Sequence, residues 1–157
     1  MISLFFGPKK FLSIITQVFY YGFKNRRSFR RQTFIWDYLL RVQCELKLSN
    51  SKDPTHQDFI RLIDDISNKA DTYGKDMKFQ LFIFISLRDH KLTPYFLKIL
   101  LRPQLLQIHY ETESFLRDQT LLTFLTQILN TFNEIELKLD KNRVYYYYYK
   151  HHQQTWA

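Results

Sequence analysis

Residues 78–87 read Lys-Phe-Gln-Leu-Phe-Ile-Phe-Ile-Ser-Leu, an almost wholly apolar run near the middle of the chain. Aromatic and β-branched residues dominate it, which locally is typical of a strand. No other segment has comparable strand character, and a lone strand would leave its backbone N–H and C=O groups without partners. We therefore predict a buried central helix here and an all-α fold around it.

The composition agrees with helices. The chain has 157 residues, enough for one domain, and only 3 are glycine. Tight hairpins and glycine-rich ligand loops need glycine for positive φ, so three glycines cannot build many of either. A membrane-spanning helix needs about 18–20 apolar residues. The longest early uncharged run, residues 11–23, is too short for that.

Other segments show apolar residues at helical spacing. Asp118 is suited to cap a helix, and Pro54 and Pro103 suit first-turn positions. The helices we expect on this pattern are residues 11–24, 32–47, 56–69, 91–101, 103–110 and 118–133.

Two of these segments carry particularly clear apolar stripes, which we expect to face the core. In the first segment the stripe is Phe11, Ile14, Ile15, Val18 and Phe19. In the last segment it is Leu121, Leu122, Leu125, Ile128, Leu129 and Phe132.

The ends of the chain differ from its middle. Residues 145–157 begin with five consecutive tyrosines and show no helical period, so we expect a poorly ordered low-complexity tail. We predict an N-terminal extension at residues 1–10 and a single helical domain at residues 11–144.

The net charge of +8 is concentrated at the N-terminus. Residues 1–31 hold seven basic residues and no acidic residue, which leaves 16 basic and 15 acidic residues in the rest of the chain. The chain therefore has one basic edge and is otherwise balanced. Four arginines of this edge, together with two later lysines, are our candidates for contact with a partner: Arg26, Arg27, Arg30, Arg31, Lys75 and Lys78.

Patterns that carry catalysis or bind cofactors are weak. The histidines have no ligand spacing for zinc apart from an adjacent pair in the tail. Gly74-Lys75 lacks the first glycine and the following hydroxyl of a phosphate-binding loop. The adjacent Asp64 and Asp65 point about 100° apart on a helix and do not converge. Cys44 is interpreted as a buried small side chain. We expect no enzyme activity, no metal and no cofactor.

A series of short motifs is more specific. It includes Gly-Lys-x-x-Lys-Phe-Gln from Gly74 and Arg88-Asp89 nine residues after Phe79. It continues with Tyr110-Glu111, Asp118 and the closing Phe132-Asn133-Glu134, and upstream lie residues 18–24 and 34–38. In order and spacing these motifs resemble a RUN domain. They are similar in particular to the C-terminal RUN domain of the DENN domain-containing protein 5 subfamily of Rab-interacting regulators.

The resemblance implies a RUN-type helical bundle of about seven to eight helices, with no cofactor and no catalysis. It implies that the domain binds small GTPases of the Rab class, or their trafficking partners, at Golgi or endosomal membranes from the cytoplasm. Nucleotide exchange in such proteins resides in a DENN region, so we expect none from this domain.

We expect the motif residues themselves to be mainly structural. Trp36 and Phe79 are predicted to lie in the core, and Gly74 to occupy a helix boundary with a special backbone angle. Arg88 and Asp89 are predicted to form structural ion pairs. The same structural interpretation covers Tyr110 and Asp118.

Two other functions remain open on sequence grounds. Residues 11–24 with the arginine cluster could form a peripheral module that binds anionic lipid. The same arginines could bind nucleic-acid phosphates, although no recognised nucleic-acid motif accompanies them.

Overall fold

The computed structural model describes residues 11–24 and 32–134. These residues form a bundle of helices in the order α1 (Phe11–Tyr20), α2 (Ile35–Leu48), α3 (Pro54–Lys69), α4 (Lys75–Arg88), α5 (Leu92–Tyr95), α6 (Pro103–His109) and α7 (Gln119–Asn133). A π-helical turn, η2 (Phe96–Leu100), follows α5, and a 3₁₀ turn, η3 (Phe115–Arg117), precedes α7. The predicted all-α fold is confirmed.

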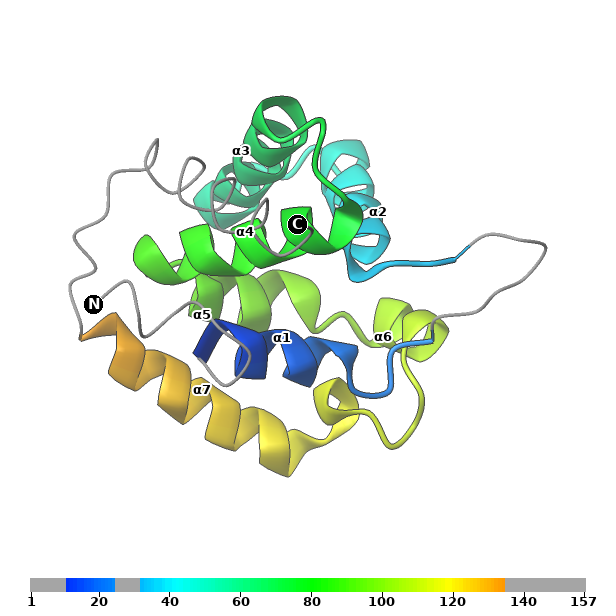
Figure 1. Ribbon diagram of the computed structural model, residues 1–157, viewed down its shortest axis with the longest axis vertical. Helices are drawn as coiled ribbons and strands as arrows, with labels where there is room; N and C mark the ends of the chain where they lie inside the picture. The colour runs from blue at the N-terminus through cyan, green and yellow to red at the C-terminus, as the bar shows by residue number, and fades with distance from the viewer. Residues whose placement is uncertain (1–10, 25–31, 135–157) are drawn as a thin grey trace, which may run out of the picture.

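Helix α4 is the centre of the bundle. It packs against α1, α2, α3 and α5, and Figure 1 shows it between the α2–α3 pair on one side and α1 and α7 on the other. All of its residues from Phe79 to Leu87 are buried except Gln80. The strand-like composition of this run therefore reflects burial on every side of a helix, because a fully buried helix needs no polar face.

The helix boundaries follow local chemistry. Asp53 caps α3 by accepting a hydrogen bond from the Thr55 N–H at 2.7 Å, and this bond lowers the pKa of the Asp53 carboxyl. Pro54 and Pro103 occupy first-turn positions as predicted. Asp118 caps α7 by accepting from the Leu121 N–H at 3.0 Å. Helix α1 ends at Tyr20, before Gly22.

The segment expected to be one helix at residues 91–101 is divided. A four-residue α-helix passes into the π-helical turn η2, closed by a 3.2 Å bond from the Leu101 N–H to the Phe96 carbonyl. The hydroxyl of buried Tyr38 donates to the Leu100 carbonyl and so satisfies one acceptor at the end of this turn. Burial raises the pKa of Tyr38, which keeps this donor protonated.

Two predictions about single residues were wrong. Cys44 is exposed, because α2 turns Leu39, Val42 and Leu46 inward and Cys44 lies about 200° from Val42 around the helix. Gly74 does stand at a helix boundary, but its φ of −60° is open to any residue and a Cβ there would meet nothing within 4 Å.

The glycine that needs its conformation is Gly22. Its φ is +75°, and a Cβ at this position would lie 2.5 Å from the Ser114 Cβ. Next to it, Phe23 forms an isolated antiparallel β-bridge with Tyr110. The chain leaving α1 is thereby fastened to the segment between α6 and η3.

Among the helices within residues 11–24 and 32–134, none combines the length and the apolar content needed to cross a bilayer.

Candidate functional site: the surface of α1 and α7

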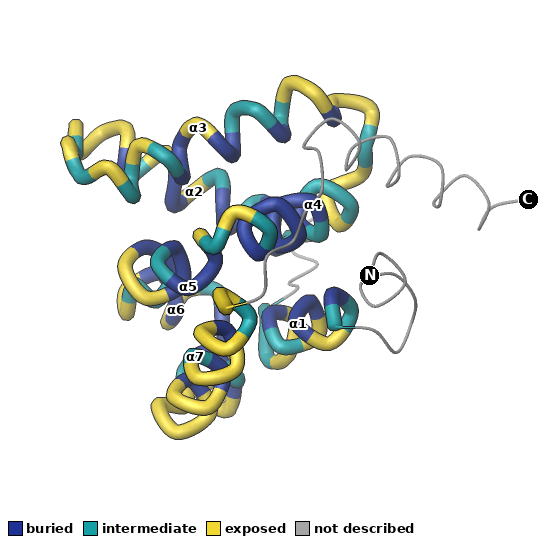
Figure 2. Tube along the Cα trace, turned by 90° about the vertical axis from the view of Figure 1, so that its left-hand side faces the viewer, coloured by how far each residue is buried: buried dark blue, intermediate teal, exposed yellow. Residues whose placement is uncertain are grey.

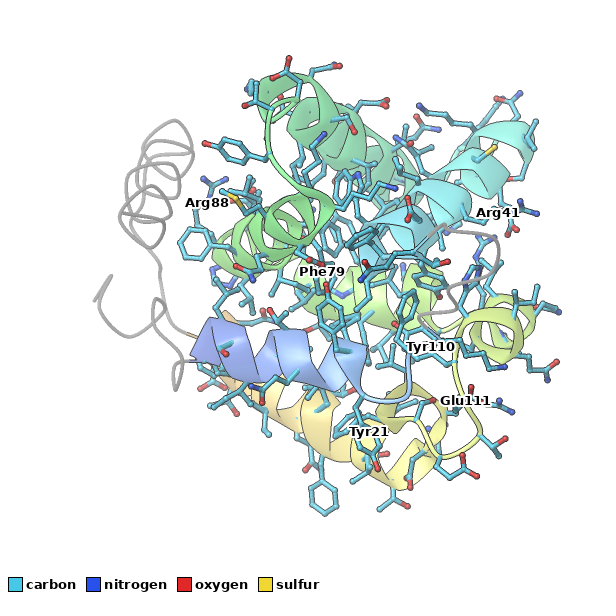
Figure 3. All side chains as sticks on the ribbon, turned by 45° about the vertical axis from the view of Figure 1, so that its right-hand side comes forward. Tyr21, Arg41, Phe79, Arg88, Tyr110 and Glu111 are labelled. Carbon is cyan, nitrogen blue, oxygen red and sulfur yellow. The ribbon has the colours of Figure 1, made fainter. Side chains whose placement is uncertain are left out.

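Helices α1 and α7 lie side by side and run in opposite directions (Figures 1 and 2). Their facing ends meet where the rings of Phe11 and Phe132 stack with centroids 3.8 Å apart. At the other end of α1, Tyr21 lies near the start of α7 (Figure 3). The two helices are therefore neighbours on the same side of α4.

Neither helix carries a charged residue. The sequence of α1 is FLSIITQVFY and that of α7 is QTLLTFLTQILNTFN. An exposed helix in a globular protein normally has charged and polar residues on its outer face. On α7 the outer face instead mixes Thr, Gln and Asn with large apolar side chains.

In each helix, fewer apolar residues are buried than the sequence pattern predicts. In α7 only Leu122, Leu125 and Leu129 are buried. The expectation that the rest of the stripe faces the core was wrong for Leu121 and Ile128 in α7, and for Ile14 in α1. The reason is that apolar residues extend around more of each helix than its neighbours cover.

Six of the exposed large apolar side chains belong to α1, to the residue after it or to α7, and one of these, Tyr20, is engaged with Asp76 and Phe79. Leu121 and Ile128 lie seven residues apart and so share a helix face, and Phe132, four residues further, places that face beside α1. Ile14 is on the side of α1 that carries Phe11. The α1–α7 surface consists of five large side chains, with the exposed fraction in parentheses: Ile14 (52%), Tyr21 (60%), Leu121 (37%), Phe124 (59%) and Ile128 (49%).

Such a surface can bind another protein through apolar contact. Scattered single apolar residues on a surface are normal, but a contiguous group with polar residues around it marks an interaction site. Phe and Tyr side chains are typical anchors because they bury much area at small cost in conformational entropy.

None of the five residues was among the candidates drawn from the sequence. The sequence did not identify them as exposed, because apolar residues at helical spacing ordinarily belong to the core. One available signal was the absence of charge over the whole of two helices, since a helix with an ordinary solvated face would carry some.

Of the six basic residues predicted to contact a partner, the structure describes Lys75 and Lys78. Arg26, Arg27, Arg30 and Arg31 lie outside the described residues. The Lys75 Nζ atom is 2.7 Å from Asp37 Oδ1 and 5.3 Å from the centre of the Phe34 ring, so this lysine ties the start of α4 to α2. Lys78 is half-buried one turn later.

The same end of α4 is also tied to α1. The Tyr20 hydroxyl donates a hydrogen bond to the Asp76 carboxylate, and the Tyr20 ring meets Phe79 edge-on at 6.0 Å. Burial of Tyr20, together with the Asp76 carboxylate, raises the pKa of the phenol. The start of α4 is therefore braced from both sides, which fixes α1 in place.

The remaining motif residues make contacts within the fold. Trp36 and Phe79 are buried in the core. The Arg88 guanidinium donates to the Asp89 carboxylate from two of its three nitrogens, Nε at 2.6 Å and Nη2 at 2.8 Å. Tyr110 is fully buried, and its ring meets Phe23 edge-on at 5.2 Å (Figure 3).

Within residues 11–24 and 32–134, no group of three or more His, Cys, Asp or Glu side chains could hold a metal ion. His109 stacks on Phe23 with centroids 6.4 Å apart, and burial, aided by Arg41 and Lys24, lowers its pKa.

Comparison with known protein families gives the fold a name. The family model described as the RUN domain matches residues 10–143, which is most of the chain. RUN domains are non-catalytic protein-interaction modules, often linked to small-GTPase signalling. Because this match covers more than half of the chain, the chain belongs to the RUN domain family.

Proposed function

We propose that this domain binds a small GTPase of the Rab class through the α1–α7 surface. The observation that carries the proposal is the pair of uncharged, antiparallel helices, on which and directly after α1 five large apolar side chains are exposed. Membership of a family of interaction modules supports a protein as the partner.

Docking would use a preformed helix face. Helix α1 is braced by the core and by the Tyr20–Asp76 bond, so little order has to be gained on binding. Anchors such as Phe124 and Tyr21 would enter apolar depressions of the GTPase switch surface. Preference for the GTP-bound form would follow because the γ-phosphate orders the switch loops.

The choice of the Rab class over other small GTPases rests on the resemblance of the sequence motifs from Gly74 to Glu134 to the DENN domain-containing protein 5 subfamily, whereas the family comparison supports the RUN domain alone. The site of action we propose is the cytoplasmic face of Golgi or endosomal membranes.

The test is calorimetric titration against a panel of Rab proteins loaded with GTP or GDP. We expect micromolar binding of at least one GTP-bound member. The variant Phe124→Lys should weaken it by at least about 30-fold, the effect of losing a central anchor of about 2 kcal/mol or more. Ile108→Lys is the matched control, because Ile108 is equally exposed but lies on α6.

Two results would contradict the proposal. One is uniform absence of binding across the panel. The other is equal loss of affinity in Phe124→Lys and Ile108→Lys, which would place the contact elsewhere.

A peripheral membrane role is the alternative. Helix α1 uses its most apolar face, with Leu12, Ile15 and Phe19, inside the core, so only the side with Ile14 and Tyr21 could meet lipid. That role requires vesicle binding that depends on anionic lipid and weakens with salt. A nucleic-acid role requires a steep salt dependence that is lost when Arg26, Arg27, Arg30 and Arg31 are replaced by Ala.

A further inference from the structure

The short segment that leads into α2 carries a second feature. Residues 30–34 read Arg-Arg-Gln-Thr-Phe, which places arginines three and two positions before Thr33 and a phenylalanine directly after it. Of all the serines and threonines in the sequence, Thr33 alone has arginine at both of these preceding positions. The Thr33 hydroxyl therefore stands in a particular basic and apolar sequence context.

This context is the one that serine/threonine kinases of the basic-directed class select. Such enzymes discriminate between substrates largely by charge, because carboxylates in their peptide cleft pair with arginines that precede the acceptor hydroxyl. Arginine suits this role since its planar guanidinium can pair with a carboxylate through two hydrogen bonds. The cleft binds its peptide as an extended chain, so Arg30 and Arg31 contribute through their places in the sequence.

The backbone at Thr33 has the form that such a cleft needs. Residues 32–34 precede α2 and belong to no helix, and Phe34 is extended with φ −113° and ψ 157°. Gln32 is exposed, and Thr33 and Phe34 are half-buried. Figure 1 shows this stretch leading away from the start of α2 at the edge of the bundle. A kinase can therefore approach the Thr33 hydroxyl without unwinding a helix.

Other hydroxyls of the fold are less suited to a kinase. Five of them donate to the carbonyl four residues earlier in their own helix: Thr16, Ser67, Thr123, Thr126 and Thr131. Thr120 is the closest comparison, because Arg117 stands three positions before it. Asp118 occupies the next position, however, and Thr120 lies in the first turn of α7. An acidic residue there opposes the carboxylates of a basic-directed kinase.

We propose that Thr33 is a phosphorylation site, modified by a kinase of the basic-directed class. In the reaction the Thr33 Oγ1 atom forms a bond to the γ-phosphorus of a nucleoside triphosphate, and the bond from that phosphorus to the β–γ bridging oxygen breaks. The electron pair of the broken bond leaves with the nucleoside diphosphate, and the hydroxyl proton passes to a base of the kinase.

The fold offers the new phosphate a place at the start of α2. A helix N-terminus attracts anions, because its first N–H groups have no partner within the helix and its dipole is positive there. In α2 the Asp37 N–H bonds to the Phe34 carbonyl at 3.0 Å, and Phe34 provides no side-chain cap. The N–H groups of Ile35 and Trp36 come before it and point out of the first turn, on the side where Thr33 lies.

A lysine and a carboxylate flank this place. The Lys75 Nζ atom lies 5.3 Å from the centre of the Phe34 ring and 2.7 Å from Asp37 Oδ1. Both side chains of this pair are partly exposed, and exposed pairs contribute little to stability. A phosphate on Thr33 carries a charge of about −1.5 to −2, so it competes with Asp37 for the lysine. We expect the phosphate to bind the first turn of α2 and Lys75 together.

The first test is incubation of the full chain with ATP and the catalytic subunit of cAMP-dependent protein kinase, followed by mass spectrometry. We expect phosphate on Thr33 and none on Thr120. Arg30→Gln should slow the incorporation at least about tenfold, because a charge-assisted pair with the kinase is lost. Absence of phosphate on Thr33 in the full chain would overturn the proposal. Equal rates for Arg30→Gln and the unchanged chain would overturn the part assigned to the arginines.

A matched variant and a second enzyme control this test. Thr33→Val has nearly the same shape without the hydroxyl, and it should lose the modification. An acid-directed kinase of the casein kinase 2 class should leave Thr33 unmodified, because it selects carboxylates around the acceptor. Faster modification of Thr33 by the acid-directed enzyme would overturn the assignment to the basic-directed class.

The place of the phosphate is tested by ³¹P NMR titration of the phosphorylated protein, folded and in urea. An exposed phosphothreonine has a second pKa of about 6. Hydrogen bonds from the first turn of α2 and the charge of Lys75 favour the dianion, so the pKa in the folded protein should lie below the value in urea. Lys75→Gln should reverse part of this difference. Equal pKa values in the folded protein and in urea would show that the phosphate remains in water, and would overturn its place at α2.

Discussion

Helices α4 and α7 are alike in sequence and opposite in situation. Both are rich in Leu, Ile and Phe and close to each other in length. Helix α4 buries eight of its 14 residues among four neighbouring helices, whereas α7 buries three of 15 and lies at the edge of the bundle (Figure 2). Apolar content therefore indicates a helix, but it does not indicate how much of that helix the protein covers.

The two helices also begin differently. Helix α7 has a side-chain cap, with Asp118 accepting from the Leu121 N–H, and α4 begins at Gly74 without one. A helix held by packing on all sides gains relatively little from its cap, whereas a helix with a thin buried stripe depends more on local bonds. Stability should thus reside in packing for α4 and partly in capping for α7.

The largest expected effect comes from truncating a phenylalanine in each helix. Phe82 is completely buried, with its ring 5.8 Å from Phe59 and 6.1 Å from Tyr95. Phe82→Ala should lower the free energy of unfolding by about 3–5 kcal/mol, because it removes a large side chain and leaves a cavity. Phe124→Ala should change it by less than about 0.5 kcal/mol. Urea unfolding followed by circular dichroism measures both.

Similar losses in the two variants would break the comparison. They would mean that Phe124 is covered in solution, for instance by a second copy of the chain. Repeating the Phe124→Ala measurement over a range of protein concentrations would reveal that case, because stability from self-association depends on concentration.

The next effect concerns the junction that places α1 beside α7. Gly22→Ala forces a side chain into a left-handed conformation and against Ser114, which precedes η3 and α7. We expect a loss of about 2–4 kcal/mol in the free energy of unfolding from strain and overpacking together. The variant should also weaken any ligand of the α1–α7 surface. A neutral result in thermal unfolding would show that this junction is not rigid.

A smaller effect is expected from Asp118→Ala, which removes the cap of α7. The loss should be about 1 kcal/mol, the usual contribution of a capping side chain. Asp118→Asn is the control, because the amide oxygen can still accept from the Leu121 N–H. If Asp118→Asn and Asp118→Ala lose equal stability in urea unfolding, the cap is not the source.

Much of the fold could be predicted from the sequence. The spacing of apolar residues predicted the positions of the helices. Pro54, Pro103 and Asp118 predicted where α3, α6 and α7 begin. These signals are local: they depend on residues within about one helical turn. Even the strand-like run at residues 78–87 was predicted correctly as a helix, because a lone strand has no hydrogen-bond partner.

The candidate site could not be predicted in the same way. Whether Ile14 or Ile128 faces the core depends on how α1 and α7 pack, which is set by residues distant in sequence. The predictions of a buried Cys44 and of a special backbone angle at Gly74 were wrong for the same reason, because each was made from the residue type without the surrounding geometry. The turn that ends α4 depends on His90, which adopts a positive φ although it is not a glycine, so the sequence did not predict it.

The smallest expected change in stability tests whether packing alone holds the start of α4. Gly74 has an extended conformation with φ −60° and ψ 157°, which suits a capping serine, and nothing lies within 4 Å of a Cβ there. Gly74→Ser should add about 0.5–1 kcal/mol to the free energy of unfolding, from the new cap and from reduced freedom of the unfolded chain. Gly74→Ala is the control, since it restricts the unfolded chain without providing a cap. A larger gain for Ser than for Ala would show that even the most buried helix of the bundle is improved by local bonding. Equal gains would mean that packing by Phe79 and its neighbours already fixes the first turn.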